Sequence, residues 1–235
     1  MKNRNPVEPE VLGETVEYYR ARAAEYEEWW ERRGRYQMRD EAQQCWFAER
    51  EQLYRVFDSL RLAGHVLEPA PGTGVWTRRL ICTAQRITAV DTSPEMLEIN
   101  RAVVDSPKVE YVLADIFTWE PSQTFDAVVF GFWISHVPAE RLNAFFAWLA
   151  SCLRPGGQLF FVDNLRDQRS TAADQVLPSE TDQVAVRKLN DGRLFRIVKT
   201  FYDAQELTSL CHQAGLEVMV QSTPTYFYYG VGKRK

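Results

Sequence analysis

The sequence lacks the features that mark several classes of protein. Its four cysteines, Cys45, Cys82, Cys152 and Cys211, are widely scattered and form no C-x-x-C pair. This spacing argues against a zinc site or a disulfide framework and favours a reducing cytoplasm. No apolar stretch is long enough to span a membrane, and the first ten residues lack the apolar core of a signal peptide, so we expect neither a membrane span nor secretion.

The charge and composition exclude a second group of functions. The formal net charge is −4, so no overall positive field attracts nucleic acid. Hydrophobic residues make up 45% and charged residues 26% of the 235, a balance typical of globular proteins. A chain of this length buries a sizeable core without metals or disulfides. We therefore expect one domain over residues 1–235, with its first ten residues frayed and no resident metal.

Aromatic residues are concentrated near the start of the chain, where the pattern predicts helices. Residues 14–33 are dense in charge but carry three tyrosines and two tryptophans. Residues 40–60 form a second segment in which apolar residues recur at helical spacing. We predict a helix over each of these ranges.

Beyond residue 62 the pattern changes to short apolar runs separated by helical segments. Because each run is mostly apolar, rather than alternating with polar residues, the runs predict a parallel sheet buried on both faces. The fold class is therefore α/β. The predicted strands are 66–67, 87–90, 111–113, 127–130 and 158–162.

The alternation of strands with helices is interrupted over residues 165–202. Asn190-Asp191-Gly192 lies between two strand-like runs, 184–189 and 194–201, which is a strong signal for a β-hairpin. We interpret this stretch as an insertion and a candidate substrate cap. Residues 203–235 return to a helix and two strands, and Pro224 marks the tight turn that makes this last pair antiparallel.

Three acidic residues follow successive strands of the predicted sheet. Glu68 ends the first strand, Asp91 the second and Asp115 the third. The carboxyl ends of parallel strands meet at one edge, where open α/β sheets bind ligands, and Asp91 stands where a carboxylate can accept two ribose hydroxyls. The loop after Glu68 contains Gly72-Thr73-Gly74 and leads into a helix, and its glycines let a ligand approach the backbone. The pattern predicts a ligand site at this edge.

These segments resemble the motifs of class I S-adenosylmethionine-dependent methyltransferases of the small-molecule type. LEPAPGTG looks like the first motif, AVDTSPEML like the second, and LADIF and FDAVVFGFWISHVP like the third and fourth. LRPGGQLFFVD resembles the strand-five motif, and FYDAQELTSLCHQAGLE the C-terminal helix and strand. The resemblance implies a donor-binding core at 62–164 and a seven-stranded Rossmann-like sheet of order 3-2-1-4-5-7-6, strand 7 antiparallel, with helices on both faces.

The resemblance also implies S-adenosylmethionine as methyl donor and a set of residues that contact it. Glu68, Gly72 and Gly74 would surround the methionine moiety, Asp91 the ribose, and Asp115 with Ile116 the adenine. Residues 14–60 would form a helical lid over the donor. The other donor-site candidates are Tyr26, Ala70, Trp76 (which alternatively only packs its helix on the sheet), Thr92, Met96 and Phe132.

One position departs from the family pattern. Ala70 stands where the family usually has glycine, between Pro69 and Pro71. Alanine tolerates close approach of a ligand to the backbone but adopts a positive φ only at a cost in free energy.

His136, just after the fourth predicted strand, is the candidate general base. Displacement at a sulfonium methyl requires positioning and exclusion of water, and requires a base only when the acceptor is a hydroxyl or an ammonium. Tyr18 or Tyr19, from the lid, is the candidate partner of its ring and completes the predicted catalytic set. The alternatives are that His136 only orders its loop and that the tyrosines only pack.

Basic residues give the predicted hairpin a positive character, which suggests an anionic acceptor such as a carboxylate or phosphate. The alternative is a solvated edge strand protected against aggregation. We expect a small-molecule acceptor methylated on oxygen or nitrogen, with no nucleic-acid or membrane partner, and the acceptor's identity and the oligomeric state stay open. The basic residues are Arg187, Lys188, Arg193, Arg196 and Lys199.

Two other functions fit parts of the pattern. A nicotinamide-dependent oxidoreductase also uses a G-x-G loop followed by an acid. This loop, however, continues from Gly74 without a third glycine, and no tyrosine-lysine pair at the required spacing follows the fourth strand. A non-catalytic donor-binding protein on the same fold is the second alternative.

Overall fold

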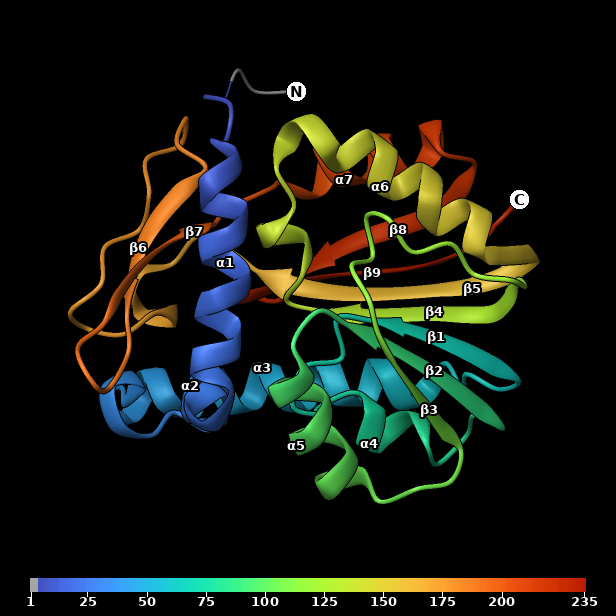
Figure 1. Ribbon diagram of the computed structural model, residues 1–235, viewed down its shortest axis with the longest axis horizontal. Helices are drawn as coiled ribbons and strands as arrows, with labels where there is room; N and C mark the ends of the chain where they lie inside the picture. Colours follow the sequence, from blue (N-terminus) through green and yellow to red (C-terminus); the bar gives the residue numbers. More distant parts are fainter. Residues whose placement is uncertain (1–3) are drawn as a thin grey trace.

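A seven-stranded sheet forms the centre of the computed structural model, which describes residues 4–235 (Figure 1). The strand order is β3-β2-β1-β4-β5-β9-β8, and only β9 runs against the other strands. This confirms the predicted order, because β8 and β9 are the sixth and seventh strands of this sheet along the chain. The strands are β1 (His65–Pro69), β2 (Arg86–Asp91), β3 (Val109–Leu113), β4 (Phe125–Gly131), β5 (Leu153–Asn164), β8 (Leu216–Ser222) and β9 (Phe227–Arg234).

The central strands are buried because both of their faces carry apolar side chains. Phe160 and Phe161 of β5 are both fully buried and point to opposite faces, as neighbouring residues of a strand do. The ring centroid of Phe160 lies 5.1 Å from that of Phe57, whereas Phe161 stacks on Phe130 at 5.5 Å. Each such buried side chain contributes roughly 1.5–3 kcal/mol to folding, so both faces of the sheet hold a core.

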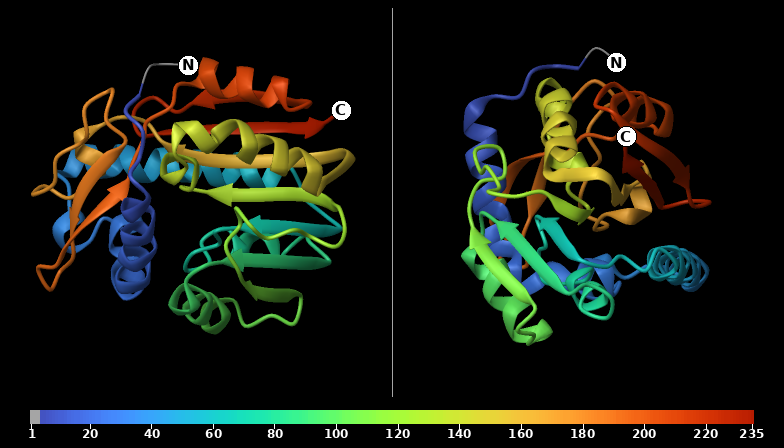
Figure 2. Two further views of the ribbon diagram at one scale, coloured as in Figure 1. Left: turned by 45° about the horizontal axis from the view of Figure 1, so that its top comes forward. Right: turned by 90° about the vertical axis from the view of Figure 1, so that its right-hand side faces the viewer.

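Helices cover both faces of the sheet, as the resemblance implied (Figures 1 and 2). Helices α6 and α7 pack on one face, and α3 and α4 pack on the other. No helix among residues 4–235 is long and apolar enough to cross a bilayer. The bounds are α3 (Asp40–Ser59), α4 (Thr77–Leu80), α5 (Pro94–Val104), α6 (Ala139–Cys152) and α7 (Ala204–Gln213).

The predicted helix over residues 14–33 is wrong at both ends. The chain forms α1 (Pro9–Arg22), a 3-10 turn η1 (Ala23–Glu25) and the short helix α2 (Tyr26–Trp30). Proline is accepted in the first helical turn because its missing N–H has no partner there, which allows the earlier start. The tighter turn η1 redirects the chain, so that Trp29 packs on Trp46 in the core while Tyr18 faces the hairpin.

The segment before α1 is anchored rather than frayed. Arg4 pairs with Glu206 of α7 at 2.8 Å, and both side chains are buried. The Val7 N–H donates to Glu140 of α6. The prediction of a frayed start is therefore wrong for residues 4–10, and residues 1–3 lie outside the described part of the chain.

The predicted hairpin forms a separate two-stranded sheet of β6 (Val184–Lys188) and β7 (Leu194–Val198). It lies beside α1, away from the central sheet (Figure 1). Tyr18 of α1 packs with Ala185, Leu189 and Ile197 of the hairpin in a small apolar cluster. Helix α1 therefore stands between the hairpin and the central sheet.

Candidate active site

The predicted ligand residues lie together at the carboxyl edge of the sheet. Asp91 ends β2, where one carboxylate oxygen accepts the Ser93 N–H at 2.9 Å and the other accepts the Gly72 N–H at 3.4 Å. Burial raises the pKa of Asp91 to about 6, and these hydrogen bonds oppose that shift. The loop after β1 and the end of β2 therefore orient this carboxylate.

The loop after β1 holds an unusual backbone conformation at Ala70. Its φ is +51°, the left-handed conformation that the sequence suggested would be costly. The Ala70 N–H donates to the Val90 carbonyl at 2.8 Å, which holds the residue in place. Gly74 has a φ of +97°, and a Cβ there would lie 3.2 Å from Asn100. The backbone conformation therefore favours glycine at Gly74, and any side chain there would crowd Asn100.

A cleft of about 430 Å³ opens between this loop and α1, and we call it the Asp91 cleft. Its walls come from the carboxyl edge of the sheet and from α1. Among the residues 4–235 no cluster of side chains suited to a metal ion is found. The predicted donor residues that line it are Tyr26, Ala70, Gly72, Asp91, Thr92, Met96, Asp115 and Phe132.

The other predicted donor residues lie behind the wall of the cleft. Ile116 is buried in the core, and Gly74 packs on Asn100. Trp76 packs between Phe57 and Phe160, and its Nε1 lies against Gly131.

Glu68 is fully buried, and neither of its carboxylate oxygens has a hydrogen-bond partner of ordinary geometry among residues 4–235. Burial raises the pKa of Glu68 to about 8, only partly offset by the nearby Thr77 hydroxyl. Buried carboxyl groups are normally paired. Glu68 and the equally unpaired Thr73 hydroxyl therefore fit the polar methionine end of the implied donor.

A second cavity, of about 50 Å³, lies on the other side of α1, and we call it the Arg22 cavity. The side chains of Arg22, Arg187 and Lys199 line it, and each is at most 9% exposed. The Arg22 guanidinium lies 4.9 Å from the ring centre of Tyr26 and 5.5 Å from that of Tyr36. Within residues 4–235 neither Arg22 nor Arg187 forms an ion pair with a carboxylate.

Lys199 is the only one of these three cations with an acidic neighbour in the described chain. Its Nζ donates to the Ser135 hydroxyl at 2.8 Å and lies 3.8 Å from the Asp163 carboxylate. Burial lowers the pKa of Lys199 to about 8, so the amine is mostly charged at pH 7 and loses its charge above pH 8. Three cations therefore line the cavity, and the carboxylate nearest to Lys199, that of Asp163, is fully buried and does not line it.

Four residues line both cavities and mark the boundary between them: Tyr19, Tyr26, Phe132 and His136. The Tyr19 hydroxyl lies 2.7 Å from Nε2 of His136, and Nδ1 of His136 lies 2.6 Å from the Val198 carbonyl. A carbonyl only accepts hydrogen bonds, so Nδ1 carries the proton of the neutral ring and Nε2 accepts a hydrogen bond from the Tyr19 hydroxyl. Burial, reinforced by Lys199, holds the pKa of His136 well below its usual range. The ring is therefore neutral.

The structure also shows which tyrosine contacts His136 and where the other two histidines lie. Tyr19, not Tyr18, contacts His136; the Tyr18 ring is buried in the hairpin cluster and also lines the Arg22 cavity. His65 hydrogen-bonds Thr88 at the opposite edge of the sheet. His212 lies in α7, away from both cavities.

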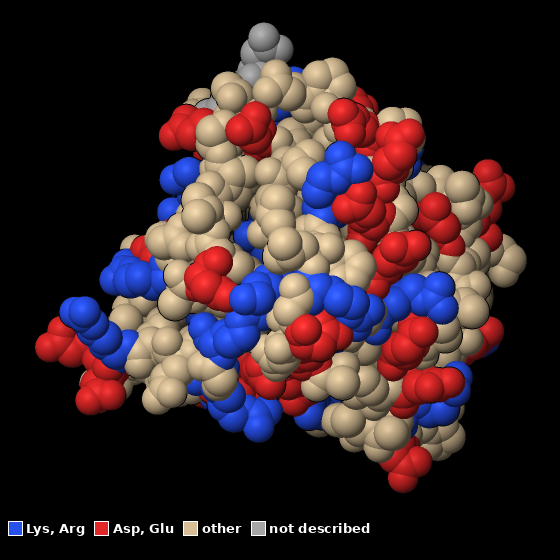
Figure 3. Space-filling model, turned by 60° about the vertical axis from the view of Figure 1, so that its left-hand side comes forward, with Lys and Arg blue, Asp and Glu red and all other residues tan. Residues whose placement is uncertain are grey.

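The basic residues of the hairpin divide between its two faces. Arg187 and Lys199 point inward to the Arg22 cavity. Arg193 pairs with Asp191, and Arg196 pairs with Glu14, both near the surface. Figure 3 shows positive and negative side chains intermingled over this side of the molecule. Arg187 and Lys199 are therefore placed where an anionic acceptor could meet them, and Arg193 and Arg196 lie where the alternative of a solvated edge strand expects them.

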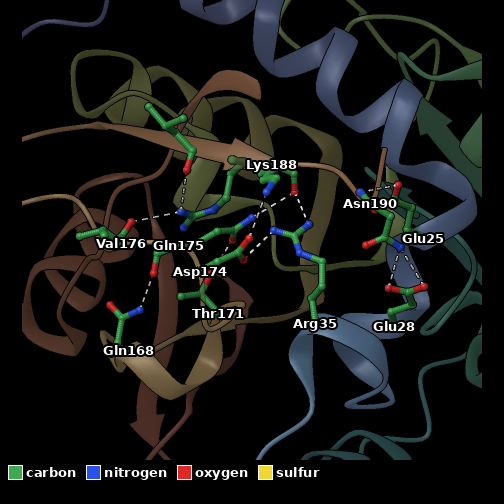
Figure 4. A network of polar contacts seen from close by, with 12 residues as sticks. Glu25, Glu28, Arg35, Gln168, Thr171, Asp174, Gln175, Val176, Lys188 and Asn190 are labelled. Atoms are coloured by element: carbon green, nitrogen blue, oxygen red, sulfur yellow. Dashed lines mark hydrogen bonds and ion pairs between the residues drawn. The ribbon is translucent and has the colours of Figure 1, made fainter. Parts of the chain in front are cut away.

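The outer wall of the Arg22 cavity is the segment 168–178, which is held by side-chain bonds (Figure 4). Gln168 donates to the Gln175 carbonyl at 2.6 Å. Arg35 donates to the Lys188 carbonyl at 2.6 Å and pairs with Asp174 at 2.7 Å. This network joins the segment to the hairpin and to the N-terminal region.

Sequence reasoning missed several residues of the two cavities. Leu12 and Val16 of α1 line the Asp91 cleft, and their spacing of four residues was the signal for a shared helix face. Arg22, one turn beyond Tyr18, was overlooked as one charge among many. Asn164, after Asp163 at the end of β5, lines the Arg22 cavity and stands at the same carboxyl edge as Asp91.

Comparison with known proteins identifies relatives of this chain. A family model described as a methyltransferase domain matches residues 66–157. Demethylmenaquinone methyltransferase of Tropheryma whipplei (strain Twist) is 26% identical over 159 residues, which cover 65% of this chain and 66% of that protein. Ribosomal RNA large subunit methyltransferase M of Pseudomonas entomophila (strain L48) is 28% identical over 156 residues, or 62% of this chain and 38% of that protein. The chain thus spans less than two thirds of the length of these curated relatives.

Solved structures provide a longer match. A DhpI complex with SAM and HEP is 33% identical, with a TM-score of 0.79, over 97% of this chain and 99% of that one. A DhpI complex with SAH is 32% identical, with a TM-score of 0.77, over 97% and 98%. Because these alignments cover nearly the whole chain, they extend beyond the central sheet to the N-terminal helices and the hairpin.

Proposed function

This chain belongs to the class I S-adenosylmethionine-dependent methyltransferases, and we propose that it methylates an oxygen of a small anionic acceptor bound in the Arg22 cavity. The methyl donor is S-adenosylmethionine, which supplies a methyl group on a positively charged sulfur. The nicotinamide-dependent alternative is set aside by this family membership. What we propose is the chemical class of the acceptor and the role of each residue in binding donor and acceptor.

The residues of the Asp91 cleft suit the donor. In the proposal, Asp91 accepts the ribose hydroxyls, Asp115 binds the adenine, and the Gly72 loop surrounds the methionine moiety. Supporting this assignment, Glu68 lies unpaired beneath that loop, and the cleft of about 430 Å³ lies along the edge that holds all four residues. Leu12 and Val16 then cover the donor from the lid side.

The observation that carries the acceptor proposal is that neither Arg22 nor Arg187 pairs with a carboxylate among residues 4–235. Within that range Arg187 donates only to the Val176 and Val186 carbonyls, which do not neutralise its charge. A buried cation without a partner carries a large desolvation penalty, so native structures almost always pair it. Aromatic rings lie around the Arg22 guanidinium, and their faces attract a cation but do not neutralise it. An anion in the cavity supplies the missing partner, and planar guanidinium groups suit a carboxylate or phosphate.

The small size of the Arg22 cavity limits the acceptor. A space of about 50 Å³ is too small for a nucleotide, which disfavours the RNA substrate of the ribosomal relative. The cavity meets the Asp91 cleft at Tyr19, Tyr26, Phe132 and His136. We therefore place the reacting oxygen beside these four residues, which exclude water and hold the acceptor in line.

His136 has one route to act as a base in this arrangement. Its Nε2 lone pair is engaged by the Tyr19 hydroxyl, so a proton from the acceptor would pass to Tyr19 as the Tyr19 proton passes to His136. An anionic oxygen arrives without a proton and needs no such transfer. We propose that His136 mainly fixes the orientation of the Tyr19 hydroxyl at the boundary.

Replacing the two unpaired arginines tests the proposal. We expect Arg22→Met and Arg187→Met to weaken acceptor binding by about 100-fold, because each removes a charge from a desolvated site, while affinity for S-adenosylhomocysteine changes less than about threefold. Acceptors are sought by supplying labelled donor with a panel of small carboxylates and phosphate esters, followed by mass spectrometry. The surface variant Arg193→Met is the matched control and should bind as the wild type does. An uncharged acceptor whose KM is unchanged in Arg22→Met would refute the anion proposal.

A further inference from the structure

Asn164 is a buried amide without a partner. It ends β5, is 6% exposed and lines the Arg22 cavity. Its backbone N–H donates to Asp163 at 2.7 Å, but its side-chain nitrogen has no hydrogen-bond partner among residues 4–235. Burying an amide without a partner is costly, and nearly all buried polar groups are paired. This amide is therefore free to bind a ligand.

Asn164 is the only uncharged side chain lining the described part of the cavity that has a fully buried polar atom without a hydrogen-bond partner. The Thr171 hydroxyl donates to the side chain of Gln175 at 2.8 Å. The Tyr19 hydroxyl donates to His136 at 2.7 Å. Asn164 therefore differs from these two neighbours in the cavity wall in having a buried polar atom without a partner among residues 4–235.

Asn164 also differs chemically from the cations of the cavity. Arg22, Arg187 and Lys199 donate hydrogen bonds and carry charge, which suits an anionic group. An amide carries no charge and both donates and accepts, which suits a hydroxyl or a carbonyl oxygen. The cavity thus offers a ligand two kinds of binding group. Positively charged side chains come from α1 and the hairpin, and a neutral amide comes from β5.

We propose that Asn164 determines acceptor specificity by binding a second polar group of the acceptor, a hydroxyl or carbonyl oxygen close to its anionic group. This inference rests on the proposed function and defines the acceptor as a small bifunctional oxoanion. The two groups are only a few atoms apart, because a cavity of about 50 Å³ holds roughly three or four water-sized groups. An acceptor lacking the second group leaves the amide unpaired and binds more weakly.

The test compares pairs of oxoanions that differ by one hydroxyl. Propionate and lactate form one pair, butyrate and 3-hydroxybutyrate a second, and ethyl phosphate and 2-hydroxyethyl phosphate a third. Calorimetric titration of the protein saturated with S-adenosylhomocysteine measures binding without turnover. We expect the hydroxylated member of at least one pair to bind 10- to 100-fold more tightly than its partner.

Variants of Asn164 then test whether this residue causes the preference for the hydroxylated oxoanion. Asn164→Leu keeps the volume but removes the amide, and we expect it to reduce the preference to less than twofold while binding of the simpler oxoanion is retained. Asn164→Gln, which retains the amide, should restore part of the preference. Thr171→Val, in the same wall but already paired internally, should keep it.

The outcomes separate this inference from the proposed function. If both members of every pair bind the wild type equally, or if Asn164→Leu keeps the preference, the role of Asn164 is wrong and the anionic acceptor stands. If none of the oxoanions binds, and Arg22→Met changes nothing, the proposed function fails and this inference fails with it.

Discussion

Ala70 and Phe132 hold left-handed backbone conformations at the Asp91 cleft, with φ values of +51° and +58°. Such conformations cost roughly 1–3 kcal/mol for a residue with a side chain. Each is held by a backbone hydrogen bond to a neighbouring strand, from Ala70 to Val90 and from Phe132 to Val162. The strain at both residues coincides with the positions that would contact donor and acceptor, which is where proteins concentrate strain.

His136→Gln distinguishes an orienting role from base catalysis. If the acceptor oxygen arrives as an anion, the loss in kcat should be about 10-fold, because only the orientation of Tyr19 is lost. General-base catalysis would make the loss 100- to 10,000-fold. Steady-state kinetics of the variant, with donor affinity measured separately, decides between these magnitudes.

The pH dependence of the wild type provides the second measurement for His136. Because burial holds its pKa well below the usual range, the ring stays neutral from pH 6.5 upward, and we expect kcat to be flat between about pH 6.5 and 7.5. Above about pH 8 the acceptor KM should rise, since Lys199 loses its proton there. A kcat that climbs with pH, and does so only when His136 is present, would show that a proton must leave the acceptor.

At the scale of elements, α1 carries two functional faces. Val11, Thr15, Tyr18 and Arg22 follow helical spacing and are buried. Tyr18 and Arg22 line the Arg22 cavity, and Thr15 accepts the Val198 N–H of the hairpin and also borders the Asp91 cleft. Leu12 and Val16 lie on the neighbouring face, half-buried, and line the Asp91 cleft. Half-exposed apolar side chains at a ligand cleft predict that the ligand itself completes their burial.

Hydrogen exchange tests the predicted lid. We expect donor or S-adenosylhomocysteine to slow amide exchange in α1, because burial of Leu12 and Val16 stabilises the helix against local opening. Exchange in α7, which lies away from the cleft, provides the internal control and should be unchanged. If α1 exchanges at the same rate with and without S-adenosylhomocysteine, the helix only packs and is no lid.

At the scale of the whole molecule, α1 is a wall shared by both cavities. Tyr19 borders both, Leu12 and Val16 face only the Asp91 cleft, and Arg22 faces only the Arg22 cavity. Surface ion pairs join the helix to α5 through Arg20–Glu95 and to the hairpin through Glu14–Arg196. A ligand that stabilises α1 from one side therefore prepares it for a ligand on the other.

This arrangement predicts positive coupling between the two sites. Inorganic phosphate, as an oxoanion probe, should bind at least fivefold more tightly in the presence of S-adenosylhomocysteine, and the reverse effect must have the same size. Calorimetric titration in both orders measures it. We expect Leu12→Ala to reduce the coupling without changing phosphate affinity in the absence of S-adenosylhomocysteine. Equal phosphate affinity with and without S-adenosylhomocysteine would rule out coupling through α1.

The fold and the donor edge could be predicted from the sequence because their signals are local. Apolar runs such as those at β2 and β4 identify buried strands, and Glu68, Asp91 and Asp115 follow them at one edge. The start of α1 was missed because residues 9–13, which include Pro9 and Gly13, look unfavourable to a helix. The anchoring of Arg4 was missed because its partner, Glu206, lies at the other end of the chain.

The sequence by itself determined the α/β class, the strand order implied by its motifs, and the edge at which the donor residues gather. Periodicity and motif order are properties of neighbouring residues, so they are visible without the fold. Only the tertiary structure decided that Tyr19 rather than Tyr18 meets His136, that Arg187 and Lys199 face inward, and that Asn164 has no partner. The Arg22 cavity joins residues far apart in the sequence, and burial and pairing arise only once the folded chain has removed those side chains from water.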